Sequence, residues 1–593
     1  MGESPSTPSF ANSPEDRLDS WKEIATHLDR DMTTVQRWEK REGMPVHRHL
    51  HDRSGSVYAF KSELNAWRQS RKPRLDEEKA QAVKPSASED SDLGTTGARL
   101  ARHWFVLGGV GTIVLLTLTY VFIKNRAGDP ARPKIRSVAV LPLKNLSGDP
   151  TQEYLADGMT EALIGRLSGI HDLRVISRTS VMRFKDTQLL APEIANTLGV
   201  DALVEGAIMR EGNRIRVHAQ LIRAATDEHF WSETYDRELR DVLALESDVA
   251  ESIARKVEVT VTGEEHARLT AARSISPEVY ESYLKGMFAL NNKSRSRADV
   301  EESVGFFEEA LKKDPAFAPA YVGLAHAHSE LALVFRGAPP EPERAKVVSA
   351  AQKALELDPD LAEAHSLLAA TQQERWQWTA AEAEYHRALE LNPNDAQTHG
   401  RLATWLACQG RTDEALAWVK RGRELDPVTV SGTEVAWILF LARRYDEASQ
   451  ELHSVLAVRP DDAMALWFLG FVLNANSQST EAIPVLEKAF SISGRGPAII
   501  GVLVRAYAHA GRRTDALRLV AELKKRKQAG YVPAAAFVNA YLGLGDKEEA
   551  FAWLEQAYKE QSNILQWIKV HPYFDALRDD PRFKDLLRRV GLA

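Results

Sequence analysis

Hydrophobic and polar positions follow four patterns along the chain, and each pattern predicts a different kind of element. Within residues 17–71, apolar positions recur at helical spacing and are followed by two short extended runs. Residues 104–123 carry no charge. Residues 134–262 mix helical spacing with strands, and residues 278–562 repeat a helical pattern about every 34 positions. We therefore predict a mainly α multidomain chain with a helix–hairpin domain, one transmembrane helix, an α/β domain and an α-solenoid.

The amino-terminal helices present a polar face suited to a polyanion. A first helix is predicted by the apolar face Trp21, Ile24, Ala25 and Leu28. Asp31 is placed to cap a second helix, whose polar face consists of Thr33, Gln36, Arg37 and Lys40. Arg and Gln side chains can read base edges, and Thr and Lys can contact phosphates. The runs VHRHL and SVYAF then predict a hairpin, and residues 61–67 predict a third helix.

This order of elements, with the motif WKEIATHLDRDMTTVQRWEKREGMPVHRH, resembles the winged-helix domains of the MerR and excisionase type over residues 17–71. The resemblance implies a DNA-binding site made of a recognition helix and a wing, with Thr33, Thr34, Gln36, Arg37, Lys40, Arg48, His49 and Arg53. Residues 15–75 hold 13 Lys plus Arg against 10 Asp plus Glu, so a small protein-binding module is the alternative. His47, His49 and His51 share one strand face, but without a nearby cysteine or a fourth ligand we expect phosphate contact or exposure there and no metal.

The uncharged run WFVLGGVGTIVLLTLTYVFI at 104–123 is long enough to cross a hydrocarbon layer of about 30 Å as one helix. Lys and Arg are more frequent after the run than before it, which by itself favours an outside amino terminus. A DNA-binding domain is useful only on the side of the chromosome, so we expect a cytoplasmic amino terminus. Residues 1–16 are expected to be disordered, and residues 72–102 to form a flexible linker.

The region after the predicted membrane helix alternates strands and helices. SVAVLPL predicts a buried strand, and residues 153–167 predict a helix. Three extended runs follow between 202 and 235, separated by turns at 211–213 and 225–227. The succession LPLKNLSGDPTQEYLADGMTEAL, DALVEGAIMREGNRIRVHAQLI and HFWSETYDREL resembles the TolB-amino-terminal-like domain, which accompanies helical repeats in bacterial signalling proteins.

This α/β region lacks recognisable catalytic motifs. LSGDP is not followed by the Lys-Ser/Thr of a phosphate-binding loop, and neither a framed nucleophile nor an HExxH pair is present. Asp149, Asp157 and Glu161 lie near a turn and a helix start, where helix capping is the expected explanation. We therefore expect no catalytic residues, no cofactor and no enzyme activity.

The carboxyl-terminal half has a 34-residue period. Prolines at 315, 359, 393, 427 and 460 mark it, with about ten inserted residues between the first two. Small residues recur twelve apart in three units, as Ala403/Ala415, Ala436/Ala448 and Gly470/Ala482, where they would let paired helices approach. The pattern resembles tetratricopeptide repeats, with about eight units in 278–562 and a cap at 563–593. Such arrays imply a protein or peptide partner in a concave groove, although a purely structural or dimerising role is the alternative.

The whole chain of 593 residues has a net charge of −7, so any basic surface must be local. Its single cysteine, Cys408, excludes an internal disulfide and is expected to be a packed core residue. As an architecture, the domain order resembles membrane-anchored one-component transcription regulators of the ToxR/CadC class. That resemblance implies an inner-membrane regulator that dimerises on DNA and has a periplasmic sensor. The alternative is a membrane-tethered tetratricopeptide scaffold without DNA binding.

Overall fold

The computed structural model describes residues 134–271, 274–291, 297–332, 340–427 and 432–593, and residues 16–67 apart from 19, 29, 31, 33, 36, 37, 40–43, 49–56 and 66. The chain divides into two compact units, Met1–Pro130 and Ala131–Ala593. The predicted membrane segment 104–123 lies outside the described residues. Among the helices that are described, none is long and apolar enough to cross a bilayer.

The amino-terminal unit contains a helix and a small antiparallel sheet. Strand β1 (Arg17–Leu18) precedes helix α1 (Trp21–Leu28), and β3 (Val57–Phe60) pairs with both β1 and β2 (His47–Arg48). The β2–β3 pairing matches the predicted hairpin, and residues 61–65 are helical. The core that holds these elements consists of Leu18, Ile24, Ala25, Leu28, Val35, Met44, Val57, Ala59 and Leu64.

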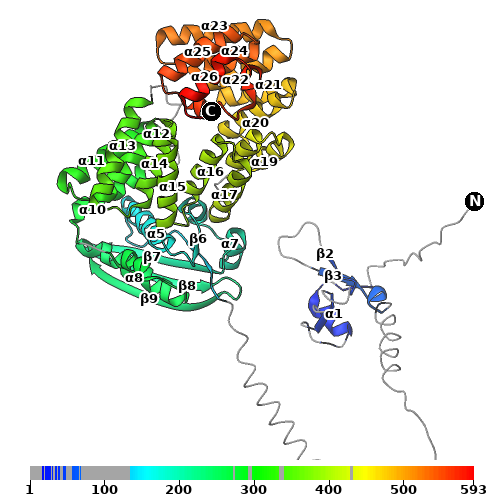
Figure 1. Cartoon of the computed structure of the whole chain (residues 1–593). Helices are drawn as coiled ribbons and strands as arrows, with labels where there is room; N and C mark the ends of the chain where they lie inside the picture. The colour runs from blue at the N-terminus through cyan, green and yellow to red at the C-terminus, as the bar shows by residue number, and fades with distance from the viewer. Residues whose placement is uncertain are drawn as a thin grey trace, which may run out of the picture. The chain divides into compact units, whose positions relative to one another are not determined.

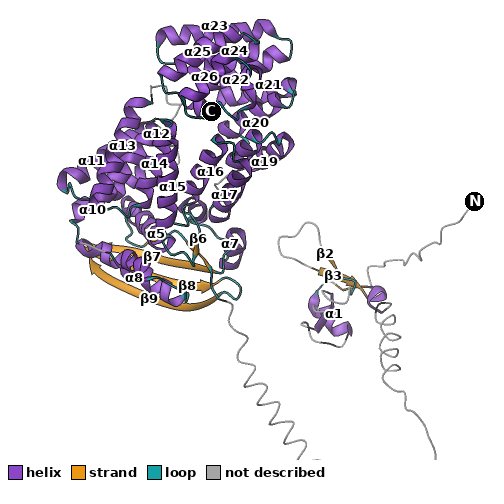
Figure 2. Cartoon of the chain, viewed as in Figure 1, coloured by secondary structure: helices purple, strands orange, loops and turns teal. Residues whose placement is uncertain are grey.

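The α/β part of the second unit has a sheet in the order β6-β4-β7-β8-β9, with β5 also paired to β7. Its strands are β4 (Ser137–Val140), β5 (Lys144–Asn145), β6 (Arg174–Val175), β7 (Ala202–Glu211), β8 (Arg214–Arg223) and β9 (Glu228–Glu238). The pairs of β7 with β4 and β5 are parallel, whereas β7–β8 and β8–β9 are antiparallel. Buried and accessible side chains alternate along most of β8, so one sheet face is covered and the other is solvated (Figure 2).

Helices α5 (Glu153–Ser168) and α8 (Val242–Lys256) pack on the sheet and on each other. The smaller elements of this part are η2 (Pro150–Gln152), α6 (Arg178–Val181), η3 (Met182–Phe184), α7 (Ala191–Leu198), η4 (Leu239–Asp241) and α9 (Gly263–Thr270). The observed strands and helix α5 agree closely with the predicted ones. The proposed capping role holds for Asp149, whose carboxylate accepts a hydrogen bond from the Thr151 amide at 2.9 Å.

In the described residues from 277 to 559, sixteen helices follow as eight consecutive pairs, as the 34-residue period predicts. The pairs are α10 (Pro277–Leu290) with α11 (Arg297–Lys313), α12 (Ala318–Leu331) with α13 (Glu341–Leu357), α14 (Ala362–Glu374) with α15 (Trp378–Leu391), α16 (Ala396–Cys408) with α17 (Thr412–Leu425), α18 (Gly432–Leu441) with α19 (Tyr445–Val458), α20 (Ala463–Ala475) with α21 (Ser479–Ile492), α22 (Pro497–His509) with α23 (Arg513–Ala529), and α24 (Ala534–Leu544) with α25 (Lys547–Lys559). Figure 1 shows them stacked in chain order.

Small residues permit the close approach inside each pair. Ala403, Ala415, Ala436, Ala448 and Ala482 are all fully buried. A Cβ atom added to Gly470 would lie 2.2 Å from Leu486 Cδ2, so even a methyl group does not fit there without a shift. Cys408 is also fully buried, as predicted.

The residues after α25 form η6 (Asn563–Trp567), η7 (Pro572–Leu577) and α26 (Pro581–Arg589). They cover α24 and α25 with a core that includes Leu565, Phe574 and Phe583. They also return to repeats far upstream, because Trp378 Nε1 donates to the Val590 carbonyl at 2.7 Å and Arg344 Nη1 donates to the Gln561 carbonyl at 2.9 Å. The array therefore closes on itself, and the carboxyl terminus lies beside its middle repeats (Figure 1).

Candidate functional site: the inner face of the repeats

The α/β part is joined to the repeats at two places. First, one continuous core contains residues of both, including Leu163 of α5, Tyr280 of α10 and Phe307 of α11. Gly158 of α5 allows this contact, since a Cβ atom there would lie 2.5 Å from Leu284 Cδ2.

The second joint is made by turns between repeats. The buried Asn394 side chain donates to the carbonyls of Ser168 at 2.9 Å and Leu173 at 2.8 Å, and it accepts from the Val175 amide at 3.2 Å. Asp426 accepts hydrogen bonds from the hydroxyl groups of Thr179 and Ser180. The repeats thus curve around α5, β6 and α6. We call the surface on this side of the repeats the inner face. It consists of the side chains that the first helix of each pair turns toward α5, β6 and α6 or toward residues 561–593.

The downstream half of this inner face is filled by the chain itself. His571 and Tyr573 pack against aromatic rings of α18 and α20, with centroid distances of 5.6 Å for His571–Trp437 and 5.2 Å for Tyr573–Phe471. The Arg505 guanidinium lies 3.9 Å from the centre of the Tyr573 ring. Burial lowers the pKa of His571 to about 3, and Arg505 adds to this effect. The ring is therefore neutral, consistent with its Nδ1 accepting from the Tyr573 amide at 3.1 Å.

The upstream half of the inner face carries ionic side chains instead of aromatic ones. A row of charged or titratable groups comes from four successive first helices, namely His326, Glu363, Arg401 and Glu434. His326 Nδ1 lies 3.2 Å from Glu363 Oε1, and the Glu363 side chain is 48% exposed. Across from them, Arg178 Nε of α6 lies 3.4 Å from Glu161 Oε2 of α5.

Burial and neighbouring charges perturb several of these groups. Burial raises the pKa of the Glu161 carboxyl, Arg178 opposes this effect, and Glu363 adds to it. Burial acts to lower the pKa of His326, but its hydrogen bond with Glu363 outweighs burial and the pKa is raised. Loss of hydration beside neighbouring helices raises the pKa of the Glu434 carboxyl to about 7, and Asp426 adds to the rise whereas Arg401 opposes it. Such perturbed groups cluster at functional sites more often than elsewhere.

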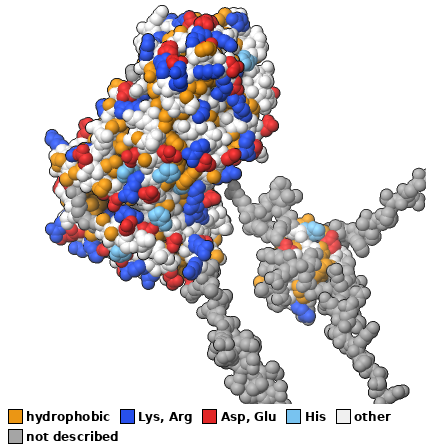
Figure 3. Space-filling model, viewed as in Figure 1, with side chains coloured by type: hydrophobic (Ala, Val, Ile, Leu, Met, Phe, Trp, Pro, Cys, Tyr) orange, Lys and Arg blue, Asp and Glu red, His pale blue; other side chains and the backbone are white. Residues whose placement is uncertain are grey.

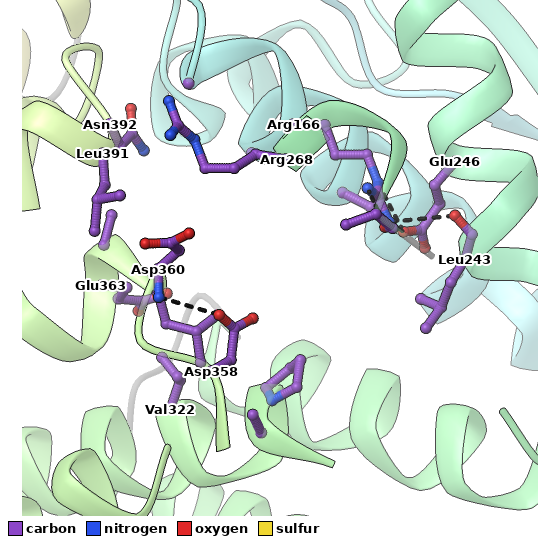
Figure 4. Close-up of a pocket in the computed structure, with 18 of the residues that line it drawn as sticks. Arg166, Leu243, Glu246, Arg268, Val322, Asp358, Asp360, Glu363, Leu391 and Asn392 are labelled. Atoms are coloured by element: carbon purple, nitrogen blue, oxygen red, sulfur yellow. Dashed lines mark hydrogen bonds and ion pairs between the residues drawn. The ribbon is translucent and has the colours of Figure 1, made fainter. Parts of the chain in front are cut away.

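A cavity of about 1310 Å³ adjoins this row, between the α/β part and repeats one to three. Figure 4 shows Arg166 and Glu246 on one side, the loop with Asp358 and Asp360 on the facing side, and Arg268 pointing toward Leu391 and Asn392. Arg166 is fully engaged in the wall, where it donates to the carbonyls of Leu243, Leu269 and Ala271 and lies 3.3 Å from Glu246.

The sequence predicts a partner in the groove of the repeats, but it does not identify the residues of this site. Capping is the wrong explanation for Asp157 and Glu161, because Asp157 pairs with Lys185 at 2.6 Å and Glu161 lines the cavity.

The predicted DNA-contacting residues Thr33, Gln36, Arg37, Lys40, His49 and Arg53 lie outside the described residues. Thr34 lies in a helical stretch and is partly buried, and Arg48 lies in β2, so the structure does not test the proposed DNA-binding set. His47 Nε2 lies 2.7 Å from Glu63 Oε2.

Comparison with known proteins agrees with the repeat architecture. A family model for the tetratricopeptide repeat matches residues 536–563, which include most of the last helix pair. The chain is 32% identical over 264 residues to a protein named putative adenylate cyclase 3 from Rhizobium meliloti (strain 1021), covering 43% of this chain and 42% of that protein. Among solved structures, that of yeast Tom70 matches 54% of this chain and 69% of its own chain at 16% identity, with a TM-score of 0.34. The chain thus contains tetratricopeptide repeats and spans less than half of its curated relative.

Proposed function

We propose that the carboxyl-terminal unit is a protein-interaction scaffold that holds a partner polypeptide on the upstream inner face, between the α/β part and helices α12–α18. The observation that carries this proposal is the contrast between the two halves of the inner face. The downstream half is filled by residues 561–593, whereas the upstream half retains partly exposed ionic groups beside a large cavity. Solenoid repeats commonly use such inner surfaces for partner binding.

The charges of this face suit recognition. His326, Glu363, Arg401 and Glu434 alternate between basic and acidic side chains. Alternating charges suppress wrong partners and fix the register of a bound chain more than they add affinity. On the face of the unit that Figure 3 shows, acidic and basic side chains are interspersed.

A photoreactive amino acid in place of Arg401 tests the proposal in the full chain. We expect cross-links from position 401 to a partner, and none to that partner from the exposed position Lys420 on α17. Reversing the charge at Glu363 and Glu434 should abolish the adducts at 401. Adducts formed equally at both positions, or unchanged by charge reversal, would contradict an inner-face binding site.

We propose a non-enzymatic role for the chain. The name of the Rhizobium relative concerns that protein, and this chain covers only 42% of it. Within the residues that the structure describes, no three His, Cys, Asp or Glu side chains are grouped so that they could hold a metal ion.

A second candidate function is DNA binding by residues 17–71. The observation that favours it is the autonomous core around α1 and the β1-β3-β2 sheet, which fits the predicted winged helix. We expect salt-sensitive retention of duplex DNA by the full chain, weakened by Arg37→Ala with Lys40→Ala. Lys22→Ala with Lys61→Ala removes the same charge elsewhere in the domain and serves as the control. Equal loss in both pairs would indicate non-specific attraction only.

The proposed membrane helix at 104–123 would place this domain in the cytoplasm and the repeats in the periplasm. Two fusions after Ala593, one of alkaline phosphatase and one of green fluorescent protein, test that placement in a bacterial host. We expect active phosphatase. An inactive phosphatase fusion together with a fluorescent green fluorescent protein fusion would place the repeats on the cytoplasmic side and leave the scaffold proposal in force.

A further inference from the structure

The charge of the cavity identifies the chemistry of a fitting partner. Its lining includes seven carboxylates and three guanidinium groups, so the formal charge of the lining is −4. The acids are Glu161, Glu246, Glu264, Glu265, Asp358, Asp360 and Glu363, and the bases are Arg166, Arg268 and Arg387. The lining therefore has more acidic than basic side chains, and it holds more than half of the net charge of −7 that the whole chain carries.

Some of these carboxylates are already neutralised and others are not. Glu246 is paired with Arg166, and Asp360 is paired with Arg387 at 2.9 Å. Within the described parts of the chain, neither Glu264 nor Asp358 has a basic side chain at ion-pair distance. The exposed carboxylates of Glu264, on α9, and Asp358, in the α13–α14 loop, therefore carry negative charge that no described basic side chain pairs, and Asp358 also accepts a hydrogen bond from the Asp360 amide at 3.0 Å.

Three carboxylates of the lining, among them the paired Glu246, act on one aromatic side chain. Burial raises the pKa of the Tyr283 hydroxyl well above its usual value, and Glu161, Glu363 and Glu246 each add to the rise. Carboxylates that approach one another repel, and a cation placed among them relieves the repulsion. Glu161 pairs with Arg178 at 3.4 Å and Glu363 pairs with His326 at 3.2 Å, and the Glu363 side chain is still 48% exposed.

The cavity also has an apolar wall and considerable size. Tyr283, Met287, Phe317, Val322 and Leu361 supply carbon surface beside the acids. A volume of about 1310 Å³ exceeds the range of about 300–1,000 Å³ that is usual for small-molecule sites. Its size suits several residues of a polypeptide, and Lys or Arg side chains can lay their methylene stems on the apolar wall.

We infer that this cavity binds a cationic peptide segment, with lysine or arginine side chains lying between the α5–α9 wall and the α13–α14 wall. The inference rests on the proposed scaffold function and adds the class of partner. The negative lining of the cavity would repel an acidic peptide, so the sign of the peptide's charge determines specificity.

Fluorescence anisotropy tests the inference with the purified full chain, kept in a non-ionic detergent because of the predicted membrane helix. The probes are three labelled nine-residue peptides that alternate alanine with lysine, glutamine or glutamate. We expect the lysine probe to bind most tightly and the glutamate probe not to bind. Replacing Glu161→Gln and Glu363→Gln together should weaken the lysine probe by about tenfold.

A matched variant, Glu447→Gln with Glu548→Gln, removes two exposed carboxylates from α19 and α25 and should leave binding unchanged. Because Glu161 and Glu363 pair with Arg178 and His326, their replacement could impair folding, so Asp358→Asn alone is measured as well, together with the circular dichroism melting curve of every variant. Equal affinity for the lysine and glutamine probes, or equal weakening in the matched variant, would overturn the inference. If a partner cross-links at position 401 but is not displaced by the lysine probe, the proposed scaffold function would stand, but the inference that the partner is a cationic peptide would be wrong.

Discussion

Asn394 gives the sharpest test of how the repeats hold the α/β part. Its side chain makes four interdomain hydrogen bonds of 2.8 to 3.4 Å, to the Ser168, Ile170 and Leu173 carbonyls and from the Val175 amide. Asn394→Ala would remove all four and leave buried backbone groups without partners. Each such group costs about 1–3 kcal/mol, so we expect a loss of about 3 kcal/mol or more in the free energy of unfolding.

Two measurements together locate the effect of Asn394→Ala. Denaturant unfolding followed by tryptophan fluorescence should show the loss, and hydrogen exchange should become faster at the Val175 amide in β6. Asn476→Ala is the control, because Asn476 is exposed and its side-chain amide donates to the side chains of Asp446 and Gln478, and we expect a change below about 0.5 kcal/mol. If Asn394→Ala also stayed within about 0.5 kcal/mol of the wild type with unchanged exchange at Val175, the joint would not depend on this amide.

Two further predictions concern packing and pH. Gly501→Ala should destabilise the unit by about 1–3 kcal/mol, because the new Cβ would lie 2.3 Å from the Ala536 carbonyl oxygen. Gly305→Ala on α11 should stabilise the unit by about 0.5–1 kcal/mol, because a Cβ there has nothing within 4 Å. Thermal unfolding of both variants checks the opposite signs, and a stabilised Gly501→Ala would contradict the close α22–α24 contact. The folded-state pKa of His571 is lowered to about 3, so the unfolded chain takes up this proton at a higher pH and stability should fall as pH drops from about 6.5 toward 3. His571→Gln should show a shallower decline of unfolding free energy over that window, and an unchanged slope would refute a buried neutral imidazole.

The local elements follow from the sequence, because helices and strands impose their own periods on nearby residues. The helix predicted at 153–167 is α5 (Glu153–Ser168), and the three extended runs are β7, β8 and β9. The 34-residue period gave the eight helix pairs for the same reason, since each repeat packs mainly on its neighbours. Gly470 and its alanine equivalents marked the tight contacts inside these pairs.

The candidate site could not be predicted in the same way. His326, Glu363, Arg401 and Glu434 are separated by unequal intervals that do not match the repeat, so no sequence pattern groups them. They share one face only because successive pairs curve around α5 and α6. Asp157 and Glu161 resembled capping residues for the same reason, since their partners Lys185 and Arg178 come from a later segment.

The helices and strands, the number of repeats and the positions of their small residues can be read from the amino-acid sequence, because these properties depend on backbone geometry and nearest neighbours. The folded chain was needed to find that Asn394 joins the repeats to the α/β part, that residues 561–593 fill the downstream inner face, and that carboxylates from five elements line one cavity. Those contacts link residues up to hundreds of positions apart, and their energies depend on burial and charge proximity that exist only after the array has curved and closed.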